Sequence, residues 1–366
     1  MLKLLSPAKR APTARELEYR DITSPQPKPV DSLYDPPSVT LSVVVPAYNE
    51  CQRLPTMLKD AQTYLDARLS YGQQHRKGHN RSSSTTSLAS PTAAEPCDSS
   101  SESSGSESTL LADAGSSDET LPGSPQSPGF ASFSYEILVV DDGSRDETTQ
   151  VALDYARKHR LNNLRVITFE HNRGKGGAVT QGFLHARGEY ILFADADGAT
   201  EFQDVGKLIT RLDAITTKKM GIAVGSRSHL QGSDAVVKRS WLRTVLMRSF
   251  HAFVYVFGIR EIEDTQCGFK LFTRRAAQAI FSNIHVERWI FDIEVLVLAR
   301  MFGIPVTEVP VTWREIAGSK MSLMRDSIQM ATDLLLLRLN YFCGVWKAST
   351  DWQQQCVIQA KLKALS

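Results

Sequence analysis

The chain has 366 residues, of which 42% are hydrophobic and 22% charged, and its formal net charge is +2. This composition is typical of a globular protein and excludes a wholly disordered or fibrous chain. No stretch reaches about 18 uninterrupted apolar residues and the first residues contain only a small apolar patch, so the chain as written is expected neither to cross a bilayer nor to carry a signal peptide. Its five cysteines have no zinc-type spacing, which favours a reduced compartment without a structural metal.

The charge is unevenly distributed along the chain. Residues 82–134 contain seven acidic side chains and no Lys or Arg, so removing this −7 from the net +2 leaves +9 on the remainder. A basic folded part suggests anionic partners such as phosphates or a lipid surface, although most such charge is simply solvated. No nucleic-acid partner is predicted.

Composition divides the chain into three regions. Residues 1–38 are Pro-rich and polar and are predicted to form a disordered tail next to a membrane. An α/β domain is expected over 39–322, with a Ser-rich insertion at 72–134 that has too little apolar surface to offset its ordering entropy. Residues 323–366 are predicted to form an amphipathic helix followed by a tail.

Short β-branched runs alternate with helical patterns through the central region. Strands that alternate with crossover helices of these lengths predict a mostly parallel, Rossmann-like sheet flanked by helices. Strands are expected at 41–46, 135–142, 164–170, 189–197 and 221–227, and helices at 54–69, 146–159, 176–186 and 202–216.

A polar cluster lies at the end of each of the first four predicted strands. These clusters are PAYNE (46–50), DDGS (141–144), HNRGKGG (171–177) and ADAD (194–197). Ligands of parallel α/β sheets bind at the carboxyl ends of the strands, so four clusters in these positions predict one site.

Asp195 and Asp197 are spaced so that both carboxylates reach one hard cation at a strand end. Mg²⁺ and Mn²⁺ take oxygen ligands and share them with the phosphates of a substrate. An Asp-rich turn is the alternative, because this three-residue pattern is common by chance; the three other clusters favour the metal site.

The third cluster is neither a dinucleotide fingerprint, since position 179 is Val, nor a phosphate P-loop. Arg173 and Lys175 with free backbone N–H groups at a helix start suit a diphosphate, and tight glycine packing is the alternative. In the second cluster Asp142 suits a helix cap, which leaves Asp141 to accept hydrogen bonds from a base or ribose.

The segments VVVPAYNE, ILVVDDGSRDET, NRGKGGAVTQG, ILFADADGAT, VGSR and DTQCGFKLF resemble the inverting family-2 glycosyltransferases, which have the GT-A fold of nucleotide-diphospho-sugar transferases. ADADGAT, DTQCGFKLFTR and HVERWIFDIEVL are most similar to the members that glucosylate dolichyl phosphate. The resemblance covers residues 37–347, apart from the insertion. It implies UDP-glucose as donor, dolichyl phosphate as acceptor and a role in protein N-glycosylation at the cytoplasmic face of the endoplasmic reticulum membrane. The N-terminal membrane span of that family is missing from this chain, which begins about where the span would end.

The resemblance also implies roles for individual residues. Asp195 and Asp197 would hold Mg²⁺ or Mn²⁺, and Asp264 and Asp292 would either contact glucose hydroxyls or hold a loop by a local hydrogen bond. The expected donor-binding residues are Pro46, Tyr48, Glu50, Asp141, Arg173, Lys175 and Asp195; the expected acceptor-phosphate residues are Arg227, Lys238, Arg239 and Ser240.

Two later segments are aromatic and amphipathic. The segment 241–258 and the segment 324–346 are each predicted to lie in a membrane interface, with a core helix as the alternative for the first. Three other functions stay open from the residues alone. These are mannosyl transfer from GDP-mannose, an inactive scaffold that binds a nucleotide sugar, and a nicotinamide-dependent oxidoreductase, which lacks its glycine fingerprint here.

Overall fold

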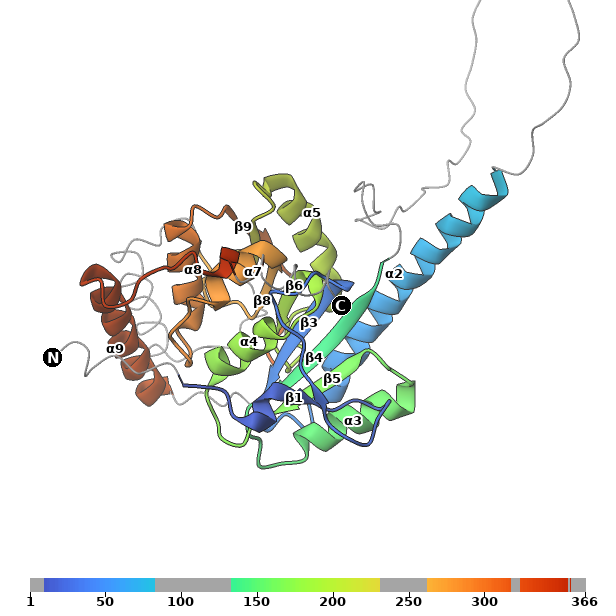
Figure 1. Ribbon diagram of the computed structural model, residues 1–366, viewed down its shortest axis with the longest axis horizontal. Coiled ribbons are helices and arrows are strands. Elements are labelled where there is room, and N and C mark those ends of the chain that lie inside the picture. Colours follow the sequence, from blue (N-terminus) through green and yellow to red (C-terminus); the bar gives the residue numbers. More distant parts are fainter. Residues whose placement is uncertain (1–9, 83–132, 231–261, 317–322, 355, 357–366) are drawn as a thin grey trace, which may run out of the picture.

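The computed structural model describes residues 10–82, 133–230, 262–316, 323–354 and 356. Its centre is a seven-stranded sheet of order β5-β4-β3-β6-β8-β7-β9 (Figure 1). Neighbouring strands of this sheet are parallel except where β8 pairs with β6 and β7. The predicted mostly parallel sheet is therefore confirmed. The strands are β3 (Val39–Ala47), β4 (Tyr135–Asp141), β5 (Leu164–Thr168), β6 (Gly188–Ala194), β7 (Ile222–Ser226), β8 (Phe269–Thr273) and β9 (Val306–Pro310).

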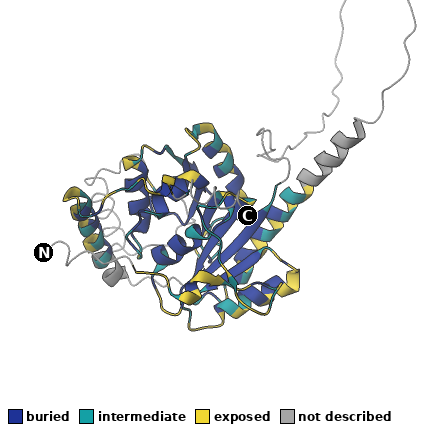
Figure 2. Ribbon diagram, viewed as in Figure 1, coloured by how far each residue is buried: buried dark blue, intermediate teal, exposed yellow. Residues whose placement is uncertain are grey.

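The sheet separates two hydrophobic cores because successive side chains of a strand point to opposite faces. Val43 and Val45 of β3 contribute to one core, whereas Val44 between them contributes to the other. Figure 2 shows the strands as the most deeply buried part of the molecule. Continuous apolar runs in the sequence thus correspond to strands covered on both sides.

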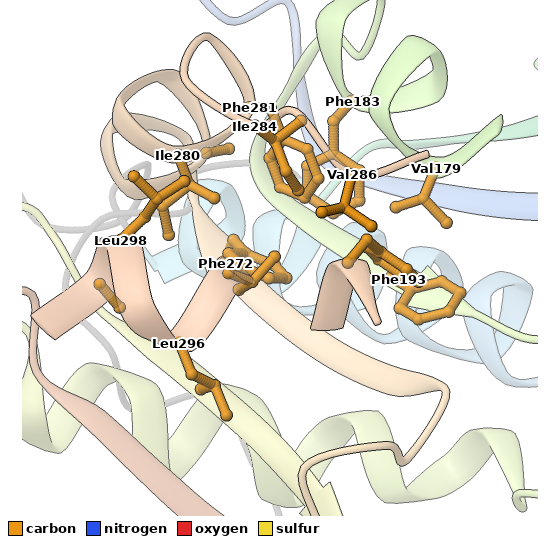
Figure 3. Close-up of a cluster of buried hydrophobic side chains, with 14 of the residues drawn as sticks. Val179, Phe183, Phe193, Phe272, Ile280, Phe281, Ile284, Val286, Leu296 and Leu298 are labelled. Atoms are coloured by element: carbon orange, nitrogen blue, oxygen red, sulfur yellow. The ribbon is translucent and has the colours of Figure 1, made fainter. Parts of the chain in front are cut away.

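Helices cover both faces of the sheet (Figure 1). One core contains side chains of α2 (Leu54–Ser82), α3 (Thr148–His159) and α5 (Val205–Ile215). The other contains side chains of α4 (Lys175–Leu184), α7 (Arg274–Phe281) and α8 (Phe291–Met301). In the second core Phe183 stacks on Phe281 with ring centroids 3.9 Å apart, and Phe272 packs edge-on against both rings (Figure 3).

The C-terminal helix α9 (Leu323–Phe342) packs against the second core through Met330, Leu334 and Leu337. The Tyr341 hydroxyl donates a hydrogen bond of 2.8 Å to the buried Glu294 carboxylate of α8. Within the described residues no helix has both the length and the hydropathy that crossing a membrane requires.

The N-terminal segment corrects one prediction. Residues 1–38 were expected to be a disordered tail, yet residues 10–38 are ordered on the domain and include η1 (Ala14–Leu17), β1 (Glu18–Tyr19) and β2 (Lys28–Pro29). Arg20 and Val166 exchange two backbone hydrogen bonds of 2.9 Å, and Leu33 is fully buried. The segment is held because it satisfies backbone groups of β5 and buries apolar surface; residues 1–9 lie outside the described residues.

The start of the predicted insertion also differs. Helix α2 continues to Ser82, although the helix was expected to end at 69 and the insertion to begin at 72. Residues 73–77 are Gln, Gln, His, Arg and Lys, which tolerate or favour a helix, and no proline interrupts them. Residues 83–132 of the predicted insertion lie outside the described residues, and the chain is described again from Phe133 onward.

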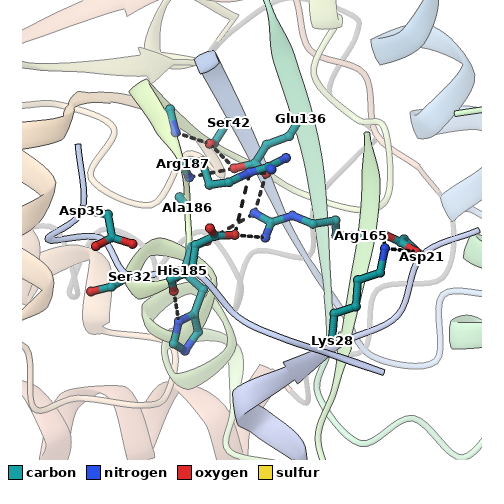
Figure 4. A network of polar contacts seen from close by, with 12 residues as sticks. Asp21, Lys28, Ser32, Asp35, Ser42, Glu136, Arg165, His185, Ala186 and Arg187 are labelled. Carbon is teal, nitrogen blue, oxygen red and sulfur yellow. Dashed lines mark hydrogen bonds and ion pairs between the residues drawn. The ribbon is translucent and has the colours of Figure 1, made fainter. Parts of the chain in front are cut away.

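A buried polar network lies near the starts of the strands (Figure 4). The Glu136 carboxylate, fully buried on β4, accepts hydrogen bonds from Ser42, from Arg165 and from the backbone and side chain of Arg187. Arg165 also donates to Asp31 of the N-terminal segment at 2.8 Å, and its guanidinium lies over the Tyr19 ring. These contacts connect the N-terminal segment to three neighbouring strands.

Candidate active site

The four polar clusters meet at the carboxyl edge of the sheet, as predicted. The Asn49 backbone N–H donates to the Ser144 hydroxyl at 2.9 Å, which connects the ends of β3 and β4. Asp142 at the end of β4 accepts a hydrogen bond of 2.6 Å from the backbone of Arg173 in the third cluster. Lys175 of that cluster reaches Asp195 at the end of β6. The prediction of a single site is therefore supported by a continuous chain of contacts.

Asp195 and Asp197 lie at the end of β6 with one nearby ammonium group. The Nζ atom of Lys175 contacts the two carboxylate oxygens of Asp195 at 2.7 and 3.0 Å. Burial raises the pKa of Asp197, and the neighbouring charge of Asp195 raises it further. Burial opposes the charge of Lys175, but Asp195 and Asp292 raise its pKa above the usual value. The two aspartates thus concentrate more negative charge than Lys175 alone neutralises.

The start of β8 approaches Asp195 so closely that only glycine fits there. Asp195 donates its backbone N–H to the Gly268 carbonyl at 3.0 Å. A Cβ atom at Gly268 would lie 1.9 Å from the Asp195 carboxylate. A side chain at position 268 would therefore displace the Asp195 carboxylate from its observed position.

The third cluster differs from its prediction, because the protein itself uses its backbone donors. The N–H groups of Arg173 and Gly174 donate to Asp142, and that of Gly177 donates to the Glu287 carbonyl at 2.9 Å. The expectation that the N–H groups of this cluster are free for a diphosphate is therefore wrong for Arg173, Gly174 and Gly177, and for the Lys175 N–H it stays a prediction. The alternative of tight glycine packing is correct, since a Cβ atom at Gly174 would lie 2.6 Å from the Glu287 carbonyl oxygen.

The guanidinium of Arg173 is buried between two carboxylates rather than presented at the site. Its Nη1 atom contacts Glu16 and its Nη2 atom contacts Glu287, both at 2.7 Å, and it also donates to the Arg10 carbonyl at 2.9 Å. Burial opposes its charge, but Glu287 and Glu16 raise its pKa. In this arrangement Arg173 holds the N-terminal segment against the loop at 287, which replaces its expected contact with the diphosphate.

The two acids of the second cluster also have different roles from those expected. Asp142 does not cap α3; its carboxylate holds the third cluster instead, and burial raises its pKa to about 7. Asp146 takes the role near the helix start by accepting from the Thr148 N–H at 3.0 Å. Asp141 is buried and accepts from the Ser144 backbone at 2.8 Å and from Thr149. The inference that one acid has no structural partner is therefore wrong.

Arg227, after β7, forms a two-pronged ion pair with Asp264. Its Nε and Nη2 atoms lie 2.6 and 2.9 Å from the two carboxylate oxygens, and the guanidinium lies over the Trp313 ring. Burial opposes ionisation of Asp264, but the hydrogen bonds and charge of Arg227 lower its pKa. Of the two roles expected for Asp264, the contacts favour the local one.

Asp292 and Lys270 form a second ion pair that is almost completely buried. The Lys270 Nζ atom lies 2.6 Å from Asp292 and donates to the Cys267 carbonyl at the same distance. The contact again favours a local role for Asp292. The sequence reasoning did not assign Lys270 to the site, although a lysine inside the apolar strand segment FKLFT was a usable signal.

The first cluster is anchored by its own ion pair. Glu50 pairs with Arg53, with Nε and Oε2 atoms 2.6 Å apart, and its backbone N–H donates a hydrogen bond of 2.8 Å to the Thr148 hydroxyl oxygen. Burial opposes the charge of Arg53, but Glu50, and also Asp197 and Asp195, raise its pKa. The sequence analysis did not assign Arg53 to the site. Pro46 is buried on β3 and Tyr48 is half-buried just beyond the strand. The expected acceptor residues Lys238, Arg239 and Ser240 lie outside the described residues.

Comparison with known proteins identifies the family. The model of glycosyl transferase family 2 matches residues 131–281. A dolichyl-phosphate β-glucosyltransferase of Homo sapiens is 41% identical over 324 residues, which is 88% of this chain and 82% of the relative. Its counterpart in Saccharomyces cerevisiae is 38% identical over 364 residues, which is 95% and 90%. The chain belongs to the dolichyl-phosphate β-glucosyltransferase family. The predicted glycosyltransferase class and GT-A fold are confirmed with it.

Among solved structures, the chain is similar to glucosyl-3-phosphoglycerate synthase of Mycobacterium tuberculosis in complex with Mn²⁺, UDP-glucose and phosphoglyceric acid. The sequence identity is 14% and the TM-score 0.45, and the match covers 84% of this chain and 80% of that one. Family membership rests on the sequence relatives, and this structure is a more distant likeness.

Proposed function

We propose that this chain transfers glucose from UDP-glucose to dolichyl phosphate with inversion, giving dolichyl β-D-glucosyl phosphate. The observation that carries the proposal is the 41% identity to enzymes with that name over most of both chains. The charged groups at the carboxyl edge of the sheet support a nucleotide-sugar site, because Asp195 and Asp197 offer oxygen ligands to a cation and Lys175 offers positive charge to a diphosphate.

The reaction needs little acid–base help from the protein. An oxygen of the acceptor phosphate attacks C1 of glucose, the bond from C1 to the β-phosphate oxygen of UDP breaks, and that oxygen keeps the electron pair. A phosphate monoester has its second pKa near about 6, so the attacking oxygen is already anionic at neutral pH. Attack from the side opposite the nucleotide converts the α-linked donor into a β-linked product. The protein has to orient the two phosphates and neutralise the departing one.

Asp195 and Asp197 would hold Mg²⁺ or Mn²⁺ in this reaction. Their oxygen donors suit a hard cation, and the raised pKa of Asp197 beside Asp195 marks a place where additional positive charge is favourable. When bound, such a cation supplies charge neutralisation at the diphosphate. Lys175 is the residue of the third cluster that we retain as a direct contact of the donor diphosphate, whereas Arg173 holds the N-terminal segment against the 287 loop.

For the acceptor phosphate we propose Arg227 as the main described cation, together with Lys238, Arg239 and Ser240. Arg227 is about one-third exposed and already held by Asp264. A phosphate that approaches this guanidinium would share it with Asp264, which keeps the planar group oriented for a two-pronged contact. The Arg227 guanidinium would thus be oriented before the lipid binds.

We also propose that the protein works at the cytoplasmic face of the endoplasmic reticulum membrane. On α9 the side chains of Leu335, Leu339 and Phe342 are exposed and lie on one face of the helix, whereas Met330, Leu334 and Leu337 are buried on the other. This pattern supports the expected interface role of segment 324–346. The other expected interface segment, 241–258, lies outside the described residues.

The deciding experiment supplies the purified chain with dolichyl phosphate and, in separate reactions, UDP-glucose or GDP-mannose. We expect release of UDP and formation of a glucosyl lipid, and no reaction after chelation of divalent cations. Mannosyl transfer with GDP-mannose would show instead that the chain is a mannosyltransferase. Absence of any transfer, while UDP-glucose still binds, would support an inactive scaffold instead.

A further inference from the structure

The ammonium group of Lys175 occupies the carboxylate that a divalent cation would need. It contacts both oxygens of Asp195, at 2.7 and 3.0 Å, and both side chains are partly exposed. A cation held by Asp195 would bind the same two carboxylate oxygens, close to an ammonium that repels it. The two positive groups therefore compete for one carboxylate.

The backbone around Lys175 is tightly packed, whereas its side chain is 20% exposed. It is the first residue of α4, and Gly174 before it has a positive φ of 91° and lies tightly against the 287 loop. Its Nζ atom lies 5.2 Å from the ring centroid of Phe193 and 5.8 Å from that of Trp289. An ammonium in these surroundings that gives up Asp195 needs another anion close by, because burial penalises an unpaired charge.

We propose that Lys175 makes divalent-cation binding at Asp195 conditional on the nucleotide diphosphate. The ammonium competes with the cation for Asp195 and gives up that contact when the diphosphate offers it replacement oxygens. The inference rests on the proposed donor site and adds a specific consequence to it. Cation and nucleotide then bind cooperatively, and part of the cooperativity belongs to a single side chain.

Thermodynamic linkage makes the proposal measurable without turnover. If the diphosphate removes Lys175 from Asp195, UDP must tighten cation binding by the same factor by which the cation tightens UDP binding. Without UDP, removing the ammonium removes the group that competes with the cation for Asp195. With UDP, it removes the group that would bind the diphosphate. Both effects reduce the coupling factor.

The experiment measures Mn²⁺ binding by electron paramagnetic resonance, with and without saturating UDP, in the wild type and in Lys175→Gln. Without UDP we expect Lys175→Gln to bind Mn²⁺ about tenfold more tightly than the wild type, which is the size expected for loss of one charge-assisted contact. The factor by which UDP tightens Mn²⁺ binding should fall about tenfold or more. Lys175→Arg keeps the charge and should stay close to the wild type.

Lys207→Gln is the matched control, since Lys207 makes an ion pair of the same 2.7 Å length with Asp204 and its loss changes the net charge equally. It should leave both Mn²⁺ affinities unchanged. Lys175→Met replaces the glutamine variant if thermal melting shows that the latter does not fold.

Three outcomes would overturn the inference. If wild-type Mn²⁺ binding depends on UDP but Lys175→Gln has the same affinities, the donor site stands and the role of Lys175 fails. If Lys207→Gln tightens Mn²⁺ binding as much, overall charge rather than direct competition is responsible. If neither the wild type nor the variants bind Mn²⁺ with UDP present, the proposed metal site fails and the inference fails with it.

Discussion

The two ends of the sheet carry similar charged residues, but these residues differ in how deeply they are buried and in how fully their charges are matched. Near the strand starts, Glu136 and Arg165 are almost completely buried and the carboxylate is matched by two guanidinium groups (Figure 4). At the carboxyl ends, Lys175 and Asp195 are 20% and 32% exposed and Arg227 is 33% exposed. The Glu136–Arg165 pair is closed to solvent, although Asp31 and Arg187 beside it are 34% and 28% exposed, whereas the Lys175–Asp195 pair is itself partly open to solvent. We call the first group the closed network and the second the open network.

This difference distinguishes a network of charges that stabilises the fold from one that can bind a ligand. A buried network with every charge matched gains nothing from a further ion, because each oxygen already has its donor. At the carboxyl ends, the carboxylates of Glu50, Asp195 and Asp197 outnumber the neighbouring positive groups of Lys175 and Arg53, and burial together with the charge of Asp195 raises the pKa of Asp197. Counting ionisable residues would not distinguish the two networks, whereas exposure and charge balance do.

The first way to test the comparison is to break the closed network. We expect Glu136→Ala to lower the free energy of unfolding by about 3–5 kcal/mol, since it leaves Arg165 buried without its main partner. Urea unfolding followed by circular dichroism measures the change. Glu189→Ala, at an exposed position of the neighbouring strand β6, is the control. A loss below about 1 kcal/mol would mean that solvent reaches the network and the contrast is wrong.

The second test breaks the open network. Asp197→Asn should reduce glucosyl transfer about 100-fold or more without lowering the melting temperature. The side-chain oxygen of Asn can still accept the Ala199 N–H, now 3.0 Å from Asp197, and the substitution removes a charge that burial disfavours. Loss of a cation ligand should cost several kcal/mol of transition-state stabilisation. Initial rates with UDP-glucose and dolichyl phosphate measure the effect, and Asp154→Asn on the exposed surface of α3 is the control.

More than about a tenth of wild-type turnover in Asp197→Asn would contradict the assignment, because that corresponds to only about 1.4 kcal/mol. A large fall in melting temperature would show instead that the open network also holds the fold.

Local sequence patterns predicted the parallel strands of the first part of the sheet and the polar clusters that follow them. The strands β3 to β7 and the four polar clusters follow from apolar runs and from what comes directly after them. Strands β8 and β9 and helices α7 and α8 were not predicted as elements, although DTQCGFKLF was recognised as a motif. The antiparallel insertion of β8 between β6 and β7 follows from tertiary packing that no short segment encodes.

The wrong assignment of Arg173 has a clear physical cause. Arg173 was assigned to the diphosphate because a basic residue before a helix commonly binds anions. Its actual partners, Glu16 and Glu287, are 157 and 114 positions away in the sequence. The same distant partners explain why a Pro-rich segment was mistaken for a tail. The sequence shows which charged residues are present, but only the folded structure shows which of them form ion pairs.

The third test concerns the acceptor side of the open network. Arg227→Gln should raise the KM for dolichyl phosphate tenfold or more and leave UDP-glucose binding almost unchanged. A charge-assisted contact in a partly buried place is worth about 1.5–3 kcal/mol. The donor phosphates have Lys175 and the cation that Asp195 and Asp197 would hold. Steady-state kinetics with each substrate varied in turn measure the split. Loss of UDP-glucose affinity with an unaltered acceptor KM would place Arg227 on the donor side.

The smallest expected effect tests the segment that contacts both networks. Residues 10–35 supply Asp31 to the closed network and Glu16 to the Arg173 cluster beside the open one. Glu16→Gln keeps an acceptor for Arg173 but removes one of its two neutralising charges, while Glu287 remains. We therefore expect a loss of about 1 kcal/mol in the free energy of unfolding, clearly less than for Glu136→Ala.

Urea unfolding of Glu16→Gln beside Glu18→Gln, whose side chain is exposed, measures this difference. A cost as large as that of Glu136→Ala would mean that the Arg173 cluster is as tightly closed as the network at the strand starts. Equal stability of the two glutamine variants would mean that the segment does not restrain Arg173, and the guanidinium would again be available to the diphosphate. We expect an intermediate change in the free energy of unfolding, because Glu16 is only one of the two carboxylates that neutralise Arg173.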